Sequence, residues 1–276
     1  MRRNRIALLL AGAAVSSMAV TAGAATPTVW NHDSGSPIGP PQWGALDSAF
    51  EECGTATSQS PVDISRPVRG GGPSLKFIYR DNELVVENTG HVIEVPIPAE
   101  DGDTLKIGKS VYTLQQYHFH APSEHTLNGR HYDLEAHLVH QNAAGLTAVL
   151  AVFMKIGHHH PNELVDDIFH NAPDVAGEET EVGIDSNPNE ILPGSRSKHH
   201  NGMLVMTDYL AYSGSLTTPP CSEPVRWLIA KEPVYVSAFS VAQMHELVSL
   251  FPDYGGYPNN NRPVQPLNGR KVISRG

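Results

Sequence analysis

The sequence has few cysteines, a deficit of basic residues and no long apolar run beyond its N-terminal segment. Of its 276 residues, 19 are Lys or Arg and 29 are Asp or Glu, which gives a formal net charge of −10. This acidic balance argues against nucleic acid or an anionic lipid surface as a partner. Because nothing after the N-terminal segment is apolar enough to cross a bilayer, no membrane anchor is expected in the mature chain.

The N-terminal segment has the pattern of a secretory signal peptide. Arg2, Arg3 and Arg5 precede an apolar run rich in Ala and Leu, and Ala22-Gly23-Ala24 offers a cleavage site between small residues. A membrane anchor is the alternative, but the run is short for a spanning helix. We expect residues 1–25 to be removed near Ala24 or Ala25, and the mature protein to be periplasmic or secreted.

The rest of the chain, residues 26–276, shows no linker, repeat or break in composition, which indicates a single domain. Its two cysteines, Cys53 and Cys221, are expected to form one disulfide in an oxidising compartment. The alternative is that Cys221 is a zinc ligand or nucleophile, because it lies close to a Thr-Thr-Pro-Pro segment.

Apolar patterns separated by Gly, Asn and Asp turns predict a mainly β (α+β) fold. We expect one domain built on a large, mostly antiparallel twisted sheet with short peripheral helices. Residues 147–156 are almost entirely apolar, as in a strand buried on both faces. The predicted strands are 75–78, 83–88, 91–96, 104–107, 111–120, 134–141, 147–156, 209–213, 225–230 and 234–236.

Helix signals are few. A helix is predicted over residues 161–170, with Pro161 in its first turn, and another is predicted to start at a capping box formed by Ser240 and Gln243. Residues 178–196 are acidic and rich in Pro and Gly, which predicts a loop.

Three histidines are spaced to hold one metal ion on the face of a sheet. His118 and His120 are two residues apart in a predicted strand and therefore point to the same side, and His137 lies in the next strand. Three imidazoles leave a tetrahedral Zn²⁺ with one open position, as in catalytic rather than structural zinc sites. His158–His160 and His199-His200 are interpreted as solvated loop residues.

Oxygen-bearing side chains accompany these histidines. Gln116 and Glu135 each precede a histidine by two residues, so each can accept the outer N–H of an imidazole. Glu124 lies just beyond the first pair. A threonine hydroxyl that donates its one proton to a carboxylate can only accept a hydrogen bond from any further group. If that further group is the nucleophile, this hydrogen bond would orient it. The Leu-Thr-Thr-Pro-Pro segment is either such an element or only a loop.

Together these segments resemble the α-class carbonic anhydrases over almost all of the mature sequence. The Cys53/Cys221 pair and the export signal resemble bacterial members of the family. The motifs that carry the resemblance are 59–64 (QSPVDI), 116–120 (QYHFH), 123–125 (SEH), 135–140 (EAHLVH), 215–220 (SLTTPP) and 261–265 (NRPVQ).

The resemblance implies a zinc enzyme that interconverts carbon dioxide and bicarbonate, with ester hydrolysis as a side activity. It implies Zn²⁺ on His118, His120 and His137, with Gln116 and Glu135 supporting the ligands. Thr217 matches the threonine that hands its proton to a glutamate, here Glu124. Thr218 matches a residue near bicarbonate, and the apolar pocket for carbon dioxide matches Val139, Val149, Leu216, Val225 and Trp227.

His91 matches the proton shuttle of the family, a role that suits an imidazole titrating near neutrality. Two positions near it depart from the family pattern. His32 stands where a tyrosine is usual, and Thr89 where Asn is common. Either the water network is rearranged, or His32 adds a second titrating group near the shuttle. These departures concern proton transfer and leave the zinc chemistry untouched.

Two other function classes are compatible with parts of the pattern. His118, His120 and Glu124 also match the first metal motif of cupins, in which the glutamate would be a ligand of iron or manganese. The later cupin motif is not convincingly present. The second alternative is a non-enzymatic zinc-binding module, favoured by His158–His160. Apart from a small-molecule substrate and a homodimer, the sequence indicates no partner.

Overall fold

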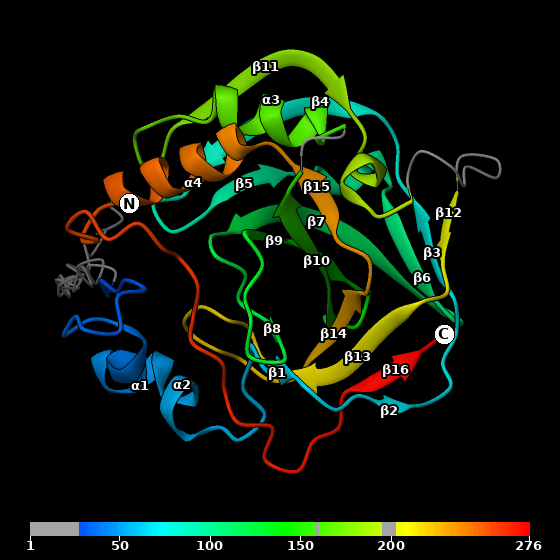
Figure 1. Cartoon of the computed structure of the whole chain (residues 1–276), viewed down its shortest axis with the longest axis horizontal. Coiled ribbons are helices and arrows are strands. Elements are labelled where there is room, and N and C mark those ends of the chain that lie inside the picture. Colours follow the sequence, from blue (N-terminus) through cyan, green and yellow to red (C-terminus); the bar gives the residue numbers. More distant parts are fainter. Residues whose placement is uncertain (1–27, 158–159, 195–202) are drawn as a thin grey trace, which may run out of the picture.

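A computed structural model describes residues 28–157, 160–194 and 203–276 (Figure 1). The predicted signal peptide, His158-His159 and His199-His200 lie outside these ranges. Within them, no helix is both long and apolar enough to cross a membrane.

Most of the strands form one mixed sheet, in which nearly all neighbours run antiparallel. Among its described strands, only the pairs β10–β14, β10–β15 and β16–β2 are parallel. In order across the sheet lie β11 (Glu179–Ser186), β4 (Asn82–Asn88), β5 (Ile93–Pro96), β7 (Ser110–His120), β9 (Leu134–Gln141), β10 (Thr147–Ile156), β14 (Val225–Ala230), β13 (Tyr209–Gly214), β16 (Ile273–Arg275) and β2 (Val68–Arg69).

Several strands lie off this path. A separate parallel pair joins β1 (Asp63–Ile64) to β8 (Thr126–Leu127). The others branch from the main sheet and are β3 (Leu75–Ile78), β6 (Thr104–Ile107), β12 (Leu204–Met206) and β15 (Val234–Val236). The predicted fold class is confirmed, and the ends of the predicted strands shift by at most two residues.

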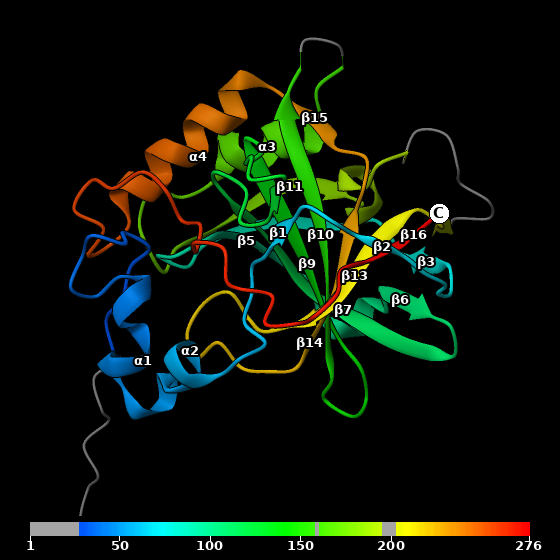
Figure 2. The same ribbon diagram turned by 60° about the horizontal axis from the view of Figure 1, so that its bottom comes forward.

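The helices are short and lie outside the sheet (Figures 1 and 2). Apolar side chains of the two longest, such as Phe169 and Met244, join sheet residues such as Leu138 and Leu150 in the main hydrophobic core. The helices are α1 (Trp43–Leu46), α2 (Glu52–Thr55), α3 (Glu163–Asn171) and α4 (Ala238–Leu250), with 3₁₀ turns η1 (Pro40–Gln42), η2 (Ser48–Phe50), η3 (Ala99–Asp101) and η4 (Pro188–Ile191).

The predicted start of the C-terminal helix is wrong by one turn. Helix α4 begins at Ala238, and Ser237 is its N-cap, with extended backbone and a side chain that accepts from the Ser240 N–H at 3.1 Å. The Ser240 hydroxyl lies inside the helix and donates to Asp166 of α3. The Ser237 hydroxyl also donates to Asp166, so the same carboxylate holds both serines, and Ser237, which has the extended backbone of an N-cap, caps the helix.

The other helix prediction is confirmed with a shift of its start. Helix α3 begins at Glu163, after Asn162, whose side chain accepts from the Val165 N–H at 3.1 Å. Pro161 therefore lies before the cap rather than in the first turn.

The loop predicted over residues 178–196 is wrong for its first half. Residues Glu179–Ser186 form β11, which pairs antiparallel with β4, and Pro188–Ile191 form a 3₁₀ turn. The register shifts between Glu181 and Asp185, around Gly183 with φ +76°. Strand β11 lies at the edge of the sheet, is interrupted by a bulge at glycine and buries few side chains. Its acidic composition therefore resembles that of a loop.

The Cys53–Cys221 disulfide joins α2 to the loop that follows Thr218, with the Cα atoms 5.0 Å apart. The predicted pairing is therefore confirmed. The long segment from α4 to β16 runs past the N-terminal helices (Figure 1). Tyr254, Asn260 and Arg262 of this segment are buried.

Candidate metal centre

The three predicted ligands meet on one face of β7 and β9. His118 lies directly opposite His137 in the antiparallel pair, and His120 is two residues further along the same face. One ring nitrogen from each of the three lies within 4.8 Å of the others. His120 and His137 are buried, whereas His118 is partly exposed. The spacing argument therefore predicts the observed cluster.

Hydrogen bonds determine which nitrogen of two of these rings is free. His118 Nδ1 donates to Gln116 Oε1 at 2.8 Å, and His137 Nε2 donates to Glu135 Oε1 at 2.9 Å. Both oxygens can only accept, so Nε2 of His118 and Nδ1 of His137 carry lone pairs into the cluster. Gln116 and Glu135 thus lie where the sequence predicts them.

The third ring is anchored by a residue that the sequence analysis missed. His120 Nδ1 donates to the backbone oxygen of Asn260 at 2.8 Å. The Asn260 side chain donates to the backbone oxygens of Phe119 at 3.0 Å and His91 at 3.1 Å, and accepts from Ala121 N–H at 2.8 Å. Asn260 adjoins the NRPVQ motif, but a backbone contact leaves no signal in residue type.

The cluster has the charge and geometry that a divalent cation needs. Burial is the main cause that lowers the pKa of His118 and of His120, and the neighbouring imidazoles lower both further. The rings are therefore neutral at neutral pH, as metal ligands must be. His120 Nε2 is buried and has no hydrogen-bond partner within the described residues. This unpartnered nitrogen is a direct indication that the residues fit a metal.

Glu124 lies beside the cluster and is fully buried. Its Oε1 accepts from Arg262 N–H at 2.8 Å. Its Oε2 lies 3.6 Å from His120 Nε2 and 3.9 Å from His137 Nδ1, and has no hydrogen-bond partner in the described part of the chain. Thr217 is buried, but no hydrogen bond joins it to Glu124 among the described residues. Glu124 also lies outside the three-histidine group, unlike a cupin ligand.

Arg262 connects this carboxylate to the N-terminal QSPVDI motif. Its guanidinium donates to Gln59 Oε1 and Ser60 O, both at 2.8 Å, and to Cys53 O at 3.2 Å. Burial lowers the pKa of Arg262 to about 10, and the Glu124 carboxylate opposes this shift. The arginine therefore stays charged, and its side-chain contacts hold in place its own backbone N–H, which donates to Glu124.

Glu135 is held by a second histidine that the sequence analysis quoted without a role. His125 approaches the carboxylate with its Nδ1 at 2.6 Å and its backbone N–H at 2.8 Å. His125 Nε2 contacts the Tyr212 hydroxyl at 2.7 Å. Burial alone would raise the pKa of Glu135, but the His125 and His137 rings hold it below its usual range. Glu135 is thus a carboxylate that accepts from both imidazoles.

His91 lies apart from the three ligands. Its ring stacks on Trp30, with centroids 3.7 Å apart and planes 9° from parallel. The Tyr254 hydroxyl lies 3.5 Å from His91 Nδ1. Burial lowers the pKa of His91 to about 4, although Asp253 opposes the shift. The ring is therefore neutral at pH 7 in this position.

His32 lies near both His91 and the three-histidine cluster. Its Nδ1 contacts the Tyr254 hydroxyl, and its ring centroid is 6.5 Å from that of His120. Its Nε2 is buried without a partner in the described chain. Burial, and next the His120 and His91 rings, lower the pKa of His32 well below its usual value. Tyr254 and Trp30, which shape this region, were not predicted.

The five residues predicted to form the apolar pocket lie together beside the three histidines. All five belong to or pack against one hydrophobic cluster, and the Trp227 ring centroid is 4.8 Å from that of His137. Thr218 is partly exposed in the same loop as Thr217. Val149, Val225 and Trp227 are buried members of this hydrophobic cluster, and Val139 and Leu216 pack against it.

Comparisons with known proteins agree with this geometry. The eukaryotic-type carbonic anhydrase family model matches residues 38–276. The carbonic anhydrase of Klebsiella pneumoniae is 36% identical over 234 residues, 85% of this chain and 87% of the relative. That of Neisseria gonorrhoeae is 37% identical over 242 residues, 88% of this chain and 85% of the relative.

Solved structures give the same answer. An α-carbonic anhydrase from Thermovibrio ammonificans, solved with the inhibitor sulfanilamide, aligns with a TM-score of 0.78 at 35% identity, covering 90% of this chain and 100% of that one. The sequence match and the shared fold cover the metal cluster and its supporting residues alike. The chain therefore belongs to the α-type carbonic anhydrase family and is a lyase of that class.

Proposed function

We propose that this protein reversibly hydrates carbon dioxide to bicarbonate and a proton, with Zn²⁺ held by His118, His120 and His137. The observation that carries the proposal is the convergence of three imidazole nitrogens within 4.8 Å. Zinc bound to three imidazoles lowers the pKa of water to about 7 and so supplies a nucleophile at neutral pH. Gln116, Glu135 and the Asn260 backbone would keep the rings aimed at the metal.

Glu124 and Thr217 would orient the nucleophile. Glu124 Oε2 is a buried acceptor without a partner beside the ligand nitrogens. A Thr217 hydroxyl that donates to this oxygen keeps only lone pairs for the nucleophile, which must then point its own lone pair at the carbon. The Arg262 backbone N–H donates to Glu124 Oε1, which leaves Oε2 to accept from the Thr217 hydroxyl.

The apolar cluster around Trp227 would receive carbon dioxide. A neutral, linear molecule has no charge to pair, so an apolar wall beside the metal suits it, and Thr218 would contact the bicarbonate product. Ester hydrolysis would be a side activity of the same centre.

His91 would export the proton. Stacked on Trp30, the imidazole is a weak base because burial lowers its pKa to about 4. A ring turned into solvent regains a pKa near 6.5 and accepts protons well. We therefore assign the shuttle to His91 moving away from Trp30, with His32 as the next candidate.

The predicted signal peptide and the disulfide both support a location outside the cytoplasm. We infer that residues 1–25 are removed, that residues 26–276 form the enzyme domain, and that the enzyme works in the periplasm or outside the cell. The Cys53–Cys221 bond fits an oxidising compartment.

The test measures carbon dioxide hydration and metal content on three samples: the zinc-loaded protein, the chelated protein and the variant His137→Ala. We expect activity only in the first sample and loss of stoichiometric zinc in the variant. Full activity in His137→Ala would refute the ligand set. A zinc-loaded protein without hydration activity would instead indicate a zinc-binding module.

A further inference from the structure

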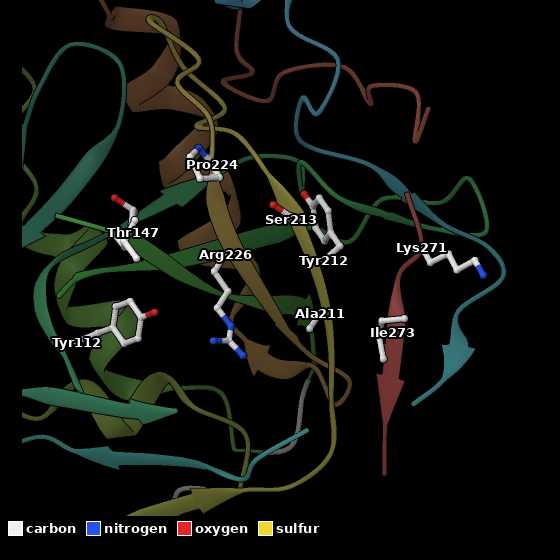
Figure 3. A pocket seen from close by; sticks show the side chains of 10 residues that line it. Tyr112, Thr147, Ala211, Tyr212, Ser213, Pro224, Arg226, Lys271 and Ile273 are labelled. Carbon is white, nitrogen blue, oxygen red and sulfur yellow. The ribbon is translucent and has the colours of Figure 1, made fainter. Parts of the chain in front are cut away.

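A cavity with a volume of about 540 Å³ lies on the sheet at the ends of β10, β13 and β14. Figure 3 shows its lining, in which Tyr112 of β7 faces residues of β13, β14 and β16. Ligand sites in proteins commonly have volumes of roughly 300–1,000 Å³. The cavity is therefore large enough for a small organic molecule.

This cavity is separate from the metal centre. Trp227 of β14 packs against His137 on the metal side of the sheet. Its neighbour Arg226 lines the cavity, and consecutive strand residues point to opposite faces. A molecule bound near the Arg226 guanidinium would thus lie across the sheet from the three histidines.

The cavity carries positive charge without a protein counter-ion. Arg226 and Lys271 line it, and neither makes an ion pair or a side-chain hydrogen bond among the described residues. None of the lining residues is acidic. The chain as a whole has a net charge of −10, so two unpaired basic side chains at one cavity make this region locally positive. Figure 3 shows Arg226 in the middle of the lining and the Lys271 ammonium directed away from it.

Most of the remaining surface of the cavity is apolar. Ile273, Ala211 and Pro224 contribute aliphatic groups, and Leu146 is 50% exposed at its edge. An apolar wall next to an unpaired guanidinium is complementary to a molecule that joins an anionic head to a hydrocarbon body.

We propose that this cavity binds a small amphiphilic carboxylate, of the class of medium-chain fatty acids. The Arg226 guanidinium receives the carboxylate through paired N–H donors, and the hydrocarbon chain lies along Ile273 and Ala211. Lys271 contributes a longer-range attraction. Because the site is remote from the histidines, its occupancy leaves the metal ligands in place.

The test titrates the zinc-loaded protein with octanoate and, separately, with octylamine, and follows binding by calorimetry. We expect saturable binding of octanoate and none of octylamine. Arg226→Gln should weaken octanoate binding by roughly ten-fold or more, and Lys271→Gln by roughly two- to three-fold. Lys109→Gln, which removes an exposed charge in the β6–β7 turn, is the matched control and should bind like the parent.

Carboxylates also bind zinc, so the same titration is repeated on His137→Ala. Octanoate binding that survives in His137→Ala and weakens in Arg226→Gln supports the cavity. Binding that disappears in His137→Ala, or that is equal in Arg226→Gln and Lys109→Gln, would overturn the proposal, as would a lack of saturable binding. Thermal unfolding of each variant verifies that it is folded.

Discussion

Burial controls the protonation of the histidines in this protein. It is the largest cause of the lowered pKa at His32, His91, His118, His120 and His140. At His118 and His120, two of the proposed ligands, this produces neutral rings at physiological pH. For the others it ties the stability of the fold to pH, because each ring must gain a proton when the chain unfolds in mild acid.

His140 offers the cleanest test of this linkage. Its Nε2 accepts from the Tyr79 hydroxyl at 2.6 Å, and burial lowers its pKa to about 4. Between pH 6.5 and 4 the unfolded chain binds a proton that the folded chain does not, so stability falls as the pH falls through this window. We expect His140 to account for about 3 kcal/mol of the loss.

The measurement is the free energy of unfolding from denaturant titrations at pH 7 and pH 4 for the parent and His140→Gln. The variant should be less stable at pH 7 and should lose less on acidification. Equal losses in the two proteins would show that His140 titrates normally.

His91→Ala should slow turnover by roughly ten-fold or more in weak buffer. In the proposed function this variant lacks the group that passes protons to solvent, so added imidazole should restore the rate. His170→Ala, which removes an exposed histidine on α3, is the control and should leave turnover unchanged. If imidazole fails to rescue His91→Ala, the shuttle lies elsewhere, and His32 is the next residue to replace.

At the scale of single elements, β11 depends on the conformation of one glycine. Gly183 has φ +76° at the register shift, and no atom lies within 4 Å of the position where a Cβ would stand. The substitution Gly183→Ala is therefore unfavourable through the backbone alone. We expect it to lower the free energy of unfolding by about 1 kcal/mol.

The matched control is Gly71→Ala, where a Cβ is also free of contacts and φ is outside the left-handed region. Urea unfolding should separate the two variants. Equal stabilities would mean that β11 accommodates the change by shifting its register.

The elements also show where sequence patterns succeed. The buried strands β7, β9 and β10 were predicted within one residue, because their apolar periodicity reflects the core that they face. The edge strand β11 was missed, because its exposed acidic residues carry no such pattern. The start of α4 was misplaced because Ser237 and Ser240 both suit an N-cap by residue type, and only the backbone conformation shows that Ser237 is the cap.

For the whole molecule, the disulfide closes a loop of 168 residues between α2 and the Thr217 loop. Replacing both cysteines by serine should lower the free energy of unfolding by about 4–5 kcal/mol, because the unfolded chain regains the entropy that the bond removes. Guanidinium unfolding of the double variant and of the oxidised and reduced parent measures the loss. A reduced parent as stable as the oxidised one would contradict this expectation.

The sequence by itself determined the fold class, the three histidines that converge, two of the side chains that hold their rings, and the disulfide. Each depends on short-range spacing or on residue type, which a linear pattern records. Only the tertiary structure decided that the Asn260 backbone anchors His120, that Arg262 links Glu124 to Gln59, and that the Tyr254 hydroxyl contacts both His32 and His91. These contacts join segments far apart in the chain, often through backbone atoms, so packing brings them together and residue type does not reveal them.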